Sequence, residues 1–454
     1  MEFDVTIIGA GPGGYTAANL CAKNGLKVAI IEKEKIGGVC LNIGCIPTKS
    51  LINIAEYYSK IKNNNEISGI KIENATIDRV TINKRLTEIS TNIVRGIEFL
   101  FKKYGVVIYK GEAKIIDKNT VLVNNEIIKT KKIIIATGSK NKDYSFLLKD
   151  NNSPNILTST EALFLEKIPE SITIIGGGAI GVEFAYIFNA FGSNVTLLEY
   201  FPVLLYNMDE ECGKSLERIF RKNKIKTIVE AKVLSISSKE NYLSVKYQKN
   251  GEELDVLSEY VLVAMGRSPN TKNLNLEGLN VATKNGFILV NEFMQTTNPD
   301  IYAVGDVVAE SPLLAHVAYR EAKIASYHIL NKDVPQLDRN LIPFCIYTEP
   351  QISGFGLTES KAKSLYPDCK ILKIFLKSNG KANAIDKTEG FIKIVTHKDK
   401  IIGCWILGVD ATEIIHNLLL VSTNDLTIDR ILNVIYAHPS ISETIFDIVQ
   451  EEYD

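Results

Sequence analysis

Hydrophobic residues along this chain recur with the periods of strands and helices, and two stretches repeat the same strand–helix–strand order. In the first stretch, apolar runs at Phe3–Ile8 and Val28–Ile31 flank a helical pattern around Ala17–Cys21. In the second stretch, apolar runs at Ile172–Ile175 and Val195–Leu198 are separated by a similar length of chain. Short strands that alternate with helices are typical of an α/β fold with parallel sheets.

Between the two stretches, the pattern predicts one long helix and several short strands. Apolar positions at helical spacing predict a helix over Lys84–Tyr104, and shorter apolar runs predict strands within Val106–Val123 and at Ile133–Ala136. The polar segment Asn141–Pro154 is expected to be a linker. Beyond the second stretch, Ile225–Ala264 alternates apolar and polar residues, as short strands do.

The C-terminal part of the chain has the pattern of an antiparallel sheet with helices. Apolar runs at Phe391–Thr396 and Ile401–Leu407 flank a short polar turn and predict a hairpin. Helices are predicted over Thr412–Val421 and from His438–Glu443 onward, with Pro439 suited to a helix start.

Each repeated stretch carries a GxGxxG glycine motif between its first strand and its helix. The motif glycines are Gly9, Gly11, Gly14, Gly176, Gly178 and Gly181. The first glycine of each motif permits a tight turn, the second lets the backbone approach a pyrophosphate, and the third packs the helix on the strand. The positive end of the helix then faces the phosphates.

An acidic residue ends the second strand of each stretch. Glu32 lies 23 residues after Gly9, and Glu199 lies 23 residues after Gly176. A carboxylate there can accept hydrogen bonds from the ribose of a dinucleotide, so the pattern predicts two dinucleotide sites. The alternative for either glutamate is a surface acid at a strand end. Tyr200 follows Glu199 where an arginine could bind a 2′-phosphate, so the second site is predicted to prefer NAD to NADP.

The segment Gly37–Leu51, with the sequence GGVCLNIGCIPTKSL, carries two cysteines separated by four residues. An ideal helix would place the Cα atoms of Cys40 and Cys45 about 8.7 Å apart, whereas a disulfide needs them within about 7 Å. A bonded pair therefore requires a break in the helix, which Asn42 and Gly44 permit. The helical pattern that follows places Cys45 near a helix N-terminus, where the dipole lowers the pKa of a thiol.

A redox-active pair is the main interpretation of these cysteines, and two alternatives stay open. A zinc site requires further Cys or His ligands at matching spacing, and the other five cysteines are solitary. Alternatively, the two thiols are unrelated small residues of the core. No metal site is predicted.

Further polar residues follow predicted strands or precede a helix. Thr137–Ser139 forms a predicted tight turn, and Asp306 can hold a sugar hydroxyl or support a turn. His438 lies beside an acid and is a candidate for an oriented general base. Ser440 and Glu443 also match a capping box, which is the structural alternative for Glu443.

Composition narrows the class of protein. The 454 residues contain 52 Lys and Arg against 53 Asp and Glu, a net charge of −1, which does not favour nucleic acid or an acidic membrane surface as a partner. No apolar run approaches the ~18 residues of a membrane span. The first strand begins near Phe3, so no signal peptide is expected. Seven cysteines do not form a secreted disulfide framework, and a cytoplasmic location is predicted.

Seven motifs occur in order: GAGPGG, GGVCLNIGCIPTKSL, IIIATGS, GGGAIGVE, MGRSPNT, IYAVGDV and AHPSISE. Over nearly the whole chain they resemble those of the flavoprotein pyridine nucleotide-disulfide oxidoreductases. The resemblance implies an α/β fold of two Rossmann-like dinucleotide-binding domains plus a C-terminal α+β dimerisation domain, with FAD and NAD as cofactors. The implied parts are an FAD domain at 1–144, an NAD domain at 145–266, a second FAD or central part at 267–335, and a dimerisation domain at 336–454.

Within this family, LNIGCIPTK, PLLAH and Glu199 resemble the branch that oxidises protein-bound dihydrolipoamide and reduces NAD⁺. The partner would be a lipoylated acyltransferase or a glycine cleavage carrier protein. The resemblance implies that His438, held by Glu443, deprotonates the substrate. The substrate thiolate then attacks Cys40, which leaves Cys45 as a thiolate beside the flavin. In the implied homodimer, the histidine of one subunit serves the cysteines of the other.

The resemblance also implies the residues that hold the cofactors. Lys49 would pair with Glu183 near the flavin. The other residues implied for FAD are Gly9, Gly11, Gly14, Glu32, Gly38, Ala113, Thr137, Gly138, Ser139, Asp306, Leu313, Leu314, Ala315 and His316. Those implied for NAD are Gly176, Gly178, Gly181, Glu199, Val233 and Gly266. Two other functions stay open: an NADPH-dependent reductase of a glutathione-like disulfide, and a flavin-bound scaffold without catalytic activity.

Overall fold

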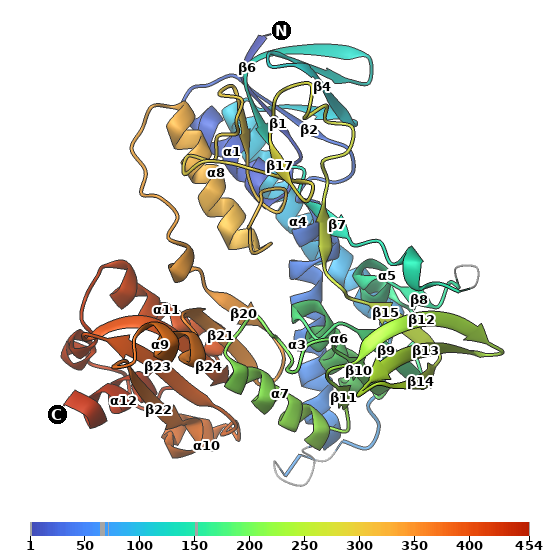
Figure 1. The fold of residues 1–454 in the computed structure, drawn as a ribbon, viewed down its shortest axis with the longest axis vertical. Helices are drawn as coiled ribbons and strands as arrows, with labels where there is room; N and C mark the ends of the chain where they lie inside the picture. Colours follow the sequence, from blue (N-terminus) through green and yellow to red (C-terminus); the bar gives the residue numbers. More distant parts are fainter. Residues whose placement is uncertain (1, 64–68, 71, 150–152, 454) are drawn as a thin grey trace.

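The computed structural model describes residues 2–63, 69–70, 72–149 and 153–453. It shows two lobes built on parallel strands and a C-terminal lobe with an antiparallel sheet (Figure 1). The predicted α/β class is confirmed.

The first lobe is built on a seven-stranded sheet in the order β3-β2-β1-β6-β5-β4, with β19 paired to β6. Its strands are β1 (Glu2–Ile8), β2 (Val28–Glu32), β3 (Val107–Lys110), β4 (Ala113–Asp117), β5 (Thr120–Val123), β6 (Glu126–Ile135) and β19 (Ile301–Ala303). β1 pairs in parallel with β2 and β6, and β19 returns to this sheet from a distant part of the sequence. The predicted strands of this region are therefore present.

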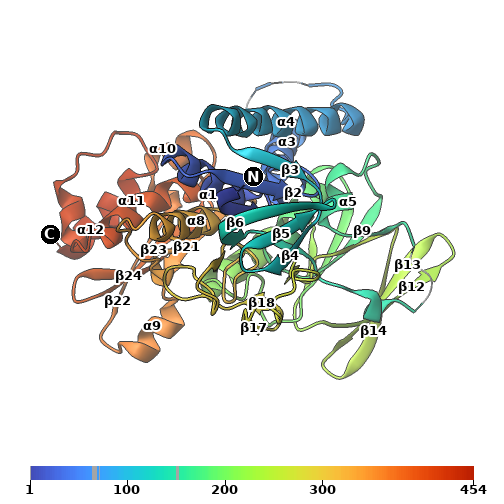
Figure 2. The same cartoon turned by 90° about the horizontal axis from the view of Figure 1, so that it is seen from above.

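Helices cover this sheet. They are α1 (Pro12–Lys23), α4 (Arg79–Tyr104) and α8 (Ala315–Ile329). Helix α4 begins five residues before the predicted start, because the Asp78 carboxylate accepts hydrogen bonds from the backbone N–H groups of Val80 and Thr81. It ends as predicted before Gly105, whose φ of 72° suits a glycine. Seen from above, α4 lies at one edge of the molecule and β17–β18 (Thr283–Lys284 and Phe287–Ile288) at the opposite edge (Figure 2).

The second lobe has a five-stranded parallel sheet in the order β11-β10-β9-β15-β8 and a three-stranded antiparallel sheet, β12-β13-β14. Its strands are β8 (Ile156–Leu157), β9 (Ser171–Ile175), β10 (Asn194–Leu198), β11 (Lys226–Ile228), β12 (Lys232–Lys239), β13 (Tyr242–Lys249), β14 (Glu252–Ser258) and β15 (Tyr260–Val263). Its helices are α5 (Ser159–Phe164), α6 (Ala179–Ala190) and α7 (Glu210–Lys222). The alternation over Ile225–Ala264 thus corresponds to strands, as predicted.

Two connections join the first two lobes. One contains β7 (Ser139–Asn141) and the other contains β16 (Arg267–Pro269), and these two strands pair antiparallel with each other. The predicted linker Asn141–Pro154 contains a short 3₁₀ helix, η1 (Ser145–Leu147), and its Leu147 is buried. Residues 150–152 of this predicted linker lie outside the described residues.

The C-terminal lobe has an antiparallel sheet in the order β20-β21-β24-β23-β22. Its strands are β20 (Phe344–Ile346), β21 (Gln351–Gly356), β22 (Lys370–Phe375), β23 (Phe391–His397) and β24 (Lys400–Gly408). Its α-helices are α9 (Glu359–Leu365), α10 (Gly380–Ala384), α11 (Ala411–Thr423) and α12 (Glu443–Tyr453). Three 3₁₀ helices accompany them: η2 (Arg339–Leu341), η3 (Leu376–Ser378) and η4 (Ile428–Asn433). The predicted hairpin is formed by β23 and β24, whose turn residues Lys398 and Asp399 both have positive φ.

The predicted start of the last helix at His438–Glu443 is wrong by several residues. Helix α12 begins at Glu443, and the preceding residues form a turn in which the His438–Pro439 peptide bond is cis. Ser440 and Glu443 hydrogen-bond to each other across this turn, which fixes the helix start at the acid rather than at the proline.

Helix α3 (Cys45–Asn63) runs through the centre of the molecule (Figure 1). Its Leu51, Ile52 and Ala55 are buried in a core that also contains residues of α6 and of the C-terminal sheet. Among the described residues, one stretch, Gly38–Lys62, is apolar and long enough to cross a membrane by length and composition. A partly buried core helix of a globular protein passes the same test, so this stretch is weak evidence for a span.

Candidate redox and nucleotide-binding site

The two cysteines lie on either side of a break between two helices. Cys40 is in α2 (Gly38–Ile43), and Cys45 is the first residue of α3. Gly44 separates the helices with φ −145° and ψ −117°. The break that a bonded pair requires is therefore present. The side chains of Cys40 and Cys45 lie within hydrogen-bonding reach of each other across this break.

The two thiols differ in acidity. The hydrogen bond from Cys40 and the positive charge of Lys49 together lower the pKa of Cys45 to about 7, against the opposing effect of burial. The same hydrogen bond and burial raise the pKa of Cys40 far above its usual value. In the reduced pair, the negative charge therefore resides on Cys45. This difference in acidity supports the prediction that substrate attacks Cys40 and that Cys45 carries the thiolate. The order of attack itself stays a prediction.

An ion pair next to the cysteines joins the first two lobes. Lys49, one turn along α3 from Cys45, lies 3.0 and 2.9 Å from the two carboxylate oxygens of Glu183 on α6. The predicted pairing of these two residues is confirmed. A third residue, Tyr347, donates its backbone N–H to Glu183 over 3.1 Å and places its ring 4.6 Å from Lys49 Nζ. Sequence reasoning missed Tyr347, which reaches this ion pair from the C-terminal lobe.

The first glycine motif forms a turn that leaves no space for side chains. A Cβ on Gly9 would lie 2.4 Å from the carbonyl oxygen of Ala136, and one on Gly14 would lie 1.9 Å from that of Gly9. Gly11 caps α1 without a side chain, and a Cβ on Gly38 would lie 2.8 Å from its Cα. The backbone at the N-terminus of α1 thus has the form that a pyrophosphate requires.

The acid at the end of β2 is held beside this turn. Glu32 accepts hydrogen bonds from the backbone N–H groups of Ala10 and Glu34, both over 2.8 Å. These contacts orient the carboxylate toward the glycine turn, where a ribose would follow the pyrophosphate. The residues of this unit therefore fit a dinucleotide such as FAD.

The second glycine motif repeats this arrangement. A Cβ on Gly176 would lie 2.5 Å from the carbonyl oxygen of Ala264, and one on Gly181 would lie 1.8 Å from that of Gly176. Gly178 caps α6 without a side chain. Glu199 accepts hydrogen bonds from the backbone N–H groups of Gly177 and Phe201, over 2.5 and 2.7 Å. The second unit therefore fits a second dinucleotide.

The remaining residues predicted for FAD lie around the junction of β6, β19 and α8. Asp306 accepts a hydrogen bond from Ser139 Oγ over 2.6 Å. Thr137 bonds to the Asn270 carbonyl, and Gly138 has a φ of 67°. Leu313 has positive φ, Leu314 caps α8, Ala315 begins that helix, and His316 contacts the carbonyl oxygen of Pro343 through Nε2.

The other predicted positions are more peripheral. Ala113, predicted near the adenine, is on β4 beside an open cavity of about 520 Å³ that is also lined by Asn273. Val233 is on β12, and Gly266 lies just before β16 with a φ of 99°. Among the described residues, no interaction assigns these three positions to a nucleotide, so their roles stay predictions.

Two charged residues near Asp306 were not predicted, the half-buried Arg267 and the buried Glu321. Arg267 donates to Ser139 Oγ and to its carbonyl oxygen, both over 2.7 Å, and thereby fixes the β7–β16 connection. Glu321 is fully buried on α8 and accepts the N–H of Gly305 over 2.6 Å, while burial raises its pKa to about 7. Arg267 belongs to the MGRSPNT motif, so the sequence contained a signal for a role of this residue. The helical pattern around Glu321 gives no sign that this acid is buried.

His438 and Glu443 meet as predicted. The Nδ1 atom of His438 lies 2.9 Å from Glu443 Oε2, while Oε1 accepts the N–H of Ser440 over 3.2 Å. Glu443 therefore orients the imidazole and caps α12 at once, so the two alternatives for this acid are compatible. The His438 side chain is 79% exposed, and within the described part of the chain no hydrogen bond joins it to either cysteine.

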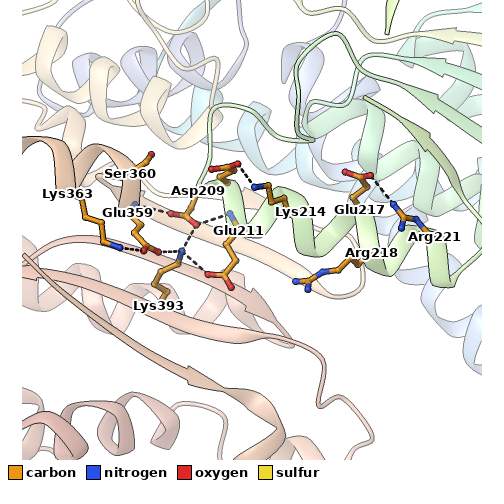
Figure 3. A pocket seen from close by; sticks show the side chains of 11 residues that line it. Asp209, Glu211, Lys214, Glu217, Arg218, Arg221, Glu359, Ser360, Lys363 and Lys393 are labelled. Atoms are coloured by element: carbon orange, nitrogen blue, oxygen red, sulfur yellow. Dashed lines mark hydrogen bonds and ion pairs between the residues drawn. The ribbon is translucent and has the colours of Figure 1, made fainter. Parts of the chain in front are cut away.

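A charged cavity of about 720 Å³ lies between α7 and the C-terminal lobe (Figure 3). At its centre Lys393 Nζ, on β23, is within 2.7 Å of Asp209, 3.0 Å of Glu211 and 2.9 Å of Glu359. None of the predicted site residues lines this cavity. Its ion pairs join the second lobe to the C-terminal lobe. Among the described residues, no group of three or more His, Cys, Asp or Glu side chains is placed to hold a metal ion.

Comparisons with known proteins agree with this geometry. Residues 3–322 match the family described as Pyridine nucleotide-disulphide oxidoreductase, and residues 342–448 match the dimerisation domain of that family. The chain is 36% identical to dihydrolipoyl dehydrogenase of Bacillus subtilis, with 98% of this chain and 96% of the relative covered. It is 37% identical to dihydrolipoyl dehydrogenase of Geobacillus stearothermophilus, with 98% and 94% covered.

Solved structures show the same architecture. The HOCl-induced flavoprotein disulfide reductase RclA from Escherichia coli superposes with a TM-score of 0.88 at 28% identity, covering 98% of this chain and 99% of that one. LpdA from Mycobacterium tuberculosis superposes with a TM-score of 0.90 at 22% identity, covering 99% of each chain, and supports the fold alone. The sequence match, the paired cysteines and the duplicated glycine turns together show that the chain belongs to the pyridine nucleotide-disulphide oxidoreductase family.

Proposed function

We propose that the protein is a dihydrolipoyl dehydrogenase, which oxidises protein-bound dihydrolipoamide to lipoamide and reduces NAD⁺ to NADH with release of a proton. The observation that carries this proposal is the cysteine pair at the start of α3, where Cys45 is acidic beside the Lys49–Glu183 ion pair. The full-length similarity to dihydrolipoyl dehydrogenases supports the same activity.

The side chains divide the proton and sulfur chemistry among them. Glu443 accepts a hydrogen bond from the Nδ1–H of His438, which leaves Nε2 free to take a proton from a substrate thiol. The resulting thiolate attacks Cys40 of the oxidised pair, and Cys45 departs as a thiolate that its lowered pKa stabilises. The second substrate thiol then displaces Cys40, which leaves substrate as a disulfide and both protein cysteines reduced.

Two cofactors complete the reaction. A bound FAD would supply the acceptor for the two electrons of the reduced cysteine pair, and a bound NAD⁺ would supply the final acceptor, as a hydride. We assign FAD to the first glycine turn with Glu32, and NAD to the second with Glu199. A carboxylate repels a 2′-phosphate, so Glu199 favours NAD and argues against an NADPH-dependent reductase of a glutathione-like disulfide. The cysteine pair and His438 argue against a scaffold without activity.

The dimerisation domain matched at residues 342–448 supports a homodimer. We propose that each active site combines the cysteines of one subunit with His438 of the other, since this histidine is exposed in the single chain. The proposed domain boundaries are 1–144, 145–266, 267–335 and 336–454, the proposed partners are a lipoylated acyltransferase or a glycine cleavage carrier protein, and the proposed location is the cytoplasm.

Formation of NADH from free dihydrolipoamide and NAD⁺ tests this function, and a heterodimer tests the shared site. Cys45→Ser and His438→Gln homodimers should be nearly inactive, whereas the control variants Cys369→Ser and His416→Gln should retain activity. A heterodimer of the two inactive subunits has one site with both defects and one with neither, so it should recover about half of wild-type activity.

An inactive heterodimer with normal flavin content would place His438 in the site of its own chain. Absence of NADH formation by the flavin-loaded wild type would contradict the proposed function itself.

A further inference from the structure

The turn between β20 and β21 brings a tyrosine of the C-terminal lobe to the ion pair that joins the first two lobes. Tyr347 is the residue that follows β20. Its backbone N–H donates to Glu183 Oε1 over 3.1 Å, and its ring lies 4.6 Å from Lys49 Nζ. The Lys49 ammonium therefore contacts both a carboxylate and an aromatic ring, and each of the three lobes contributes one of these groups.

A second contact fixes this turn along α3. Lys387, also from the C-terminal lobe, lies 2.6 Å from Glu56 of α3 and 2.9 Å from Glu349 of the turn. Lys49 and Glu56 are seven residues apart on α3, so they lie on the same face of the helix, about two turns apart. The position of Tyr347 against Lys49 is therefore set by the packing of the C-terminal lobe on α3.

The ring can hold the ammonium in place. The face of an aromatic ring attracts a cation, and the attraction is stronger where water is excluded. The Lys49 side chain is 33% exposed, so without the ring its flexible stem can turn toward solvent. Lys49 is four residues after Cys45 on α3, and its charge lowers the pKa of that thiol. A ring that keeps the ammonium here therefore acts on Cys45 through Lys49.

We propose that Tyr347 is a positioning residue of the redox centre: it holds the Lys49 ammonium near Cys45, so that the packing of the C-terminal lobe favours the Cys45 thiolate. This inference rests on the proposed function, in which Cys45 departs as a thiolate. The C-terminal lobe matches the dimerisation domain. The same contact therefore links the part of the chain that pairs the subunits to the cysteines of its own subunit.

The titratable and charged groups around Cys45 come from several elements. The hydrogen bond from Cys40 and the charge of Lys49 lower the pKa of the thiol, and the charge of Glu183 raises it. The other groups that face the cysteine pair or Tyr347 are Tyr15, Arg267, Asp306, Tyr319, Cys345 and Glu413. Burial raises the pKa of Tyr347 itself to about 12, so its phenol is neutral where Cys45 titrates. Removal of this ring changes none of these charges.

Alkylation of Cys45 in the reduced, flavin-loaded protein tests the proposal without turnover. Tyr347→Leu removes the ring, so the pH midpoint for alkylation of the Cys45 peptide should move upward by about 0.5 unit. Tyr347→Phe keeps the ring and should keep the wild-type midpoint of about 7. Tyr58→Leu is the matched control, because Tyr58 packs against the same core and its ring lies 6.0 Å from another lysine, Lys62. Its midpoint should equal that of the wild type.

A second background separates the position of Lys49 from other effects of the ring. Adding Tyr347→Leu to Lys49→Met should leave the midpoint where Lys49→Met alone puts it, because the ring acts through the ammonium. Tyr347→Met, with a longer and more adaptable side chain, gives the same comparison if Tyr347→Leu does not fold.

An unchanged or lower midpoint in the variant without the ring would overturn the proposal, and so would an equal upward shift in both backgrounds. If the midpoints shift as expected but the wild type forms no NADH from dihydrolipoamide, the proposed function is wrong and the positioning role of Tyr347 stands.

Discussion

The two strand–helix–strand units of this chain have nearly the same backbone but different side chains around it. In both units, the N–H of the first glycine donates to the end of the second strand over 2.8 Å, from Gly9 to Ile31 and from Gly176 to Leu198. The capping glycines Gly11 and Gly178 have φ values of −73° and −77°. The shared backbone is the part that a pyrophosphate requires of any dinucleotide site.

The two units differ at two places: the helix residue that corresponds to Glu183, and the residues that follow the acid. Glu183 on α6 pairs with Lys49, whereas the corresponding residue on α1 is Thr16. The second unit thus contributes to the cysteine site as well as to its own nucleotide. After the acid, the second unit carries Tyr200 and Phe201, whereas the first carries Lys33 and Glu34. The two units therefore form different sites on nearly the same backbone, because a small number of their side chains differ.

The largest effect is expected when one glycine of a single turn is replaced by alanine, so that only one of the two units is changed. A Cβ at Gly14 or Gly181 would lie within 2 Å of a carbonyl oxygen. Gly14→Ala should destabilise the protein by about 3 kcal/mol and leave it without FAD. Gly181→Ala should cost a similar amount but keep FAD and lose ADP-ribose binding. Thermal unfolding, flavin content and calorimetry measure these effects.

Gly96→Ala is the matched control for these two variants. Gly96 is exposed on α4, with no atom near its Cβ position, so alanine there should stabilise the helix by up to about 1 kcal/mol. Loss of both nucleotides in either of the two turn variants would mean that the units are not independent sites.

The buried acid Glu321 lies in the first lobe, where it accepts a hydrogen bond from the backbone N–H of Gly305. Burial raises its pKa to about 7 from a usual value of 4.5, so the folded state favours the neutral acid. Its contribution to stability is therefore full below pH 4.5 and is lost as the pH rises through 7, by about 2 to 3 kcal/mol. Glu321→Gln stays neutral and keeps an acceptor for the Gly305 N–H, so its free energy of unfolding should not fall over this range.

Parallel denaturant titrations of wild type and Glu321→Gln between pH 5 and 8 measure this difference. A constant difference in the free energy of unfolding across that range would show that Glu321 is ionised in the folded state at every pH tested.

The ion pair between the units should set the acidity of Cys45. Without the charge of Lys49, the pKa of Cys45 should rise by about 1 unit. In the reduced protein, the pH midpoint for alkylation of the Cys45 peptide should move upward from about 7 in Lys49→Met. Lys49→Arg keeps the charge and Lys60→Met removes a more distant one, so both should alkylate like the wild type. An unchanged midpoint in Lys49→Met would remove Lys49 from this role.

The smallest expected effect concerns the 2′-phosphate. Tyr200→Arg places a cation beside Glu199, so oxidation of NADPH should increase a few-fold while NADH oxidation changes little. Tyr242→Arg adds the same charge elsewhere in the second lobe and should leave the ratio of NADPH to NADH oxidation unchanged. Equal use of both cofactors by the wild type would contradict the NAD assignment.

Sequence alone predicted the features that local backbone geometry demands. The glycine motifs could be identified because each glycine stands where a side chain would overlap a carbonyl oxygen. The cysteine pair was predictable for a similar reason, since Gly44 must interrupt the helix between Cys40 and Cys45. The acids Glu32 and Glu199 follow from their fixed position at strand ends.

Features that depend on distant contacts were not predictable. Tyr347 reaches Glu183 from 164 residues away. The MGRSPNT motif contains Arg267, but it does not reveal the contact of this residue with Ser139, 128 residues away. Glu321 resembles any other acid in an amphipathic helix until the fold buries it. The start of α12 was misplaced because Pro439 lies in a turn before the helix rather than in its first turn.

The central claim is that the first unit holds FAD and the second holds NAD, and the most direct measurement compares Glu32→Ala with Glu199→Ala. Flavin content and the affinity for ADP-ribose are measured for both variants and for the wild type. Glu199→Ala should keep its flavin and bind ADP-ribose more weakly by about 1–3 kcal/mol. Glu32→Ala should lose affinity for FAD by a similar amount and keep ADP-ribose binding. The reverse pattern, or loss of both nucleotides in each variant, would contradict the account.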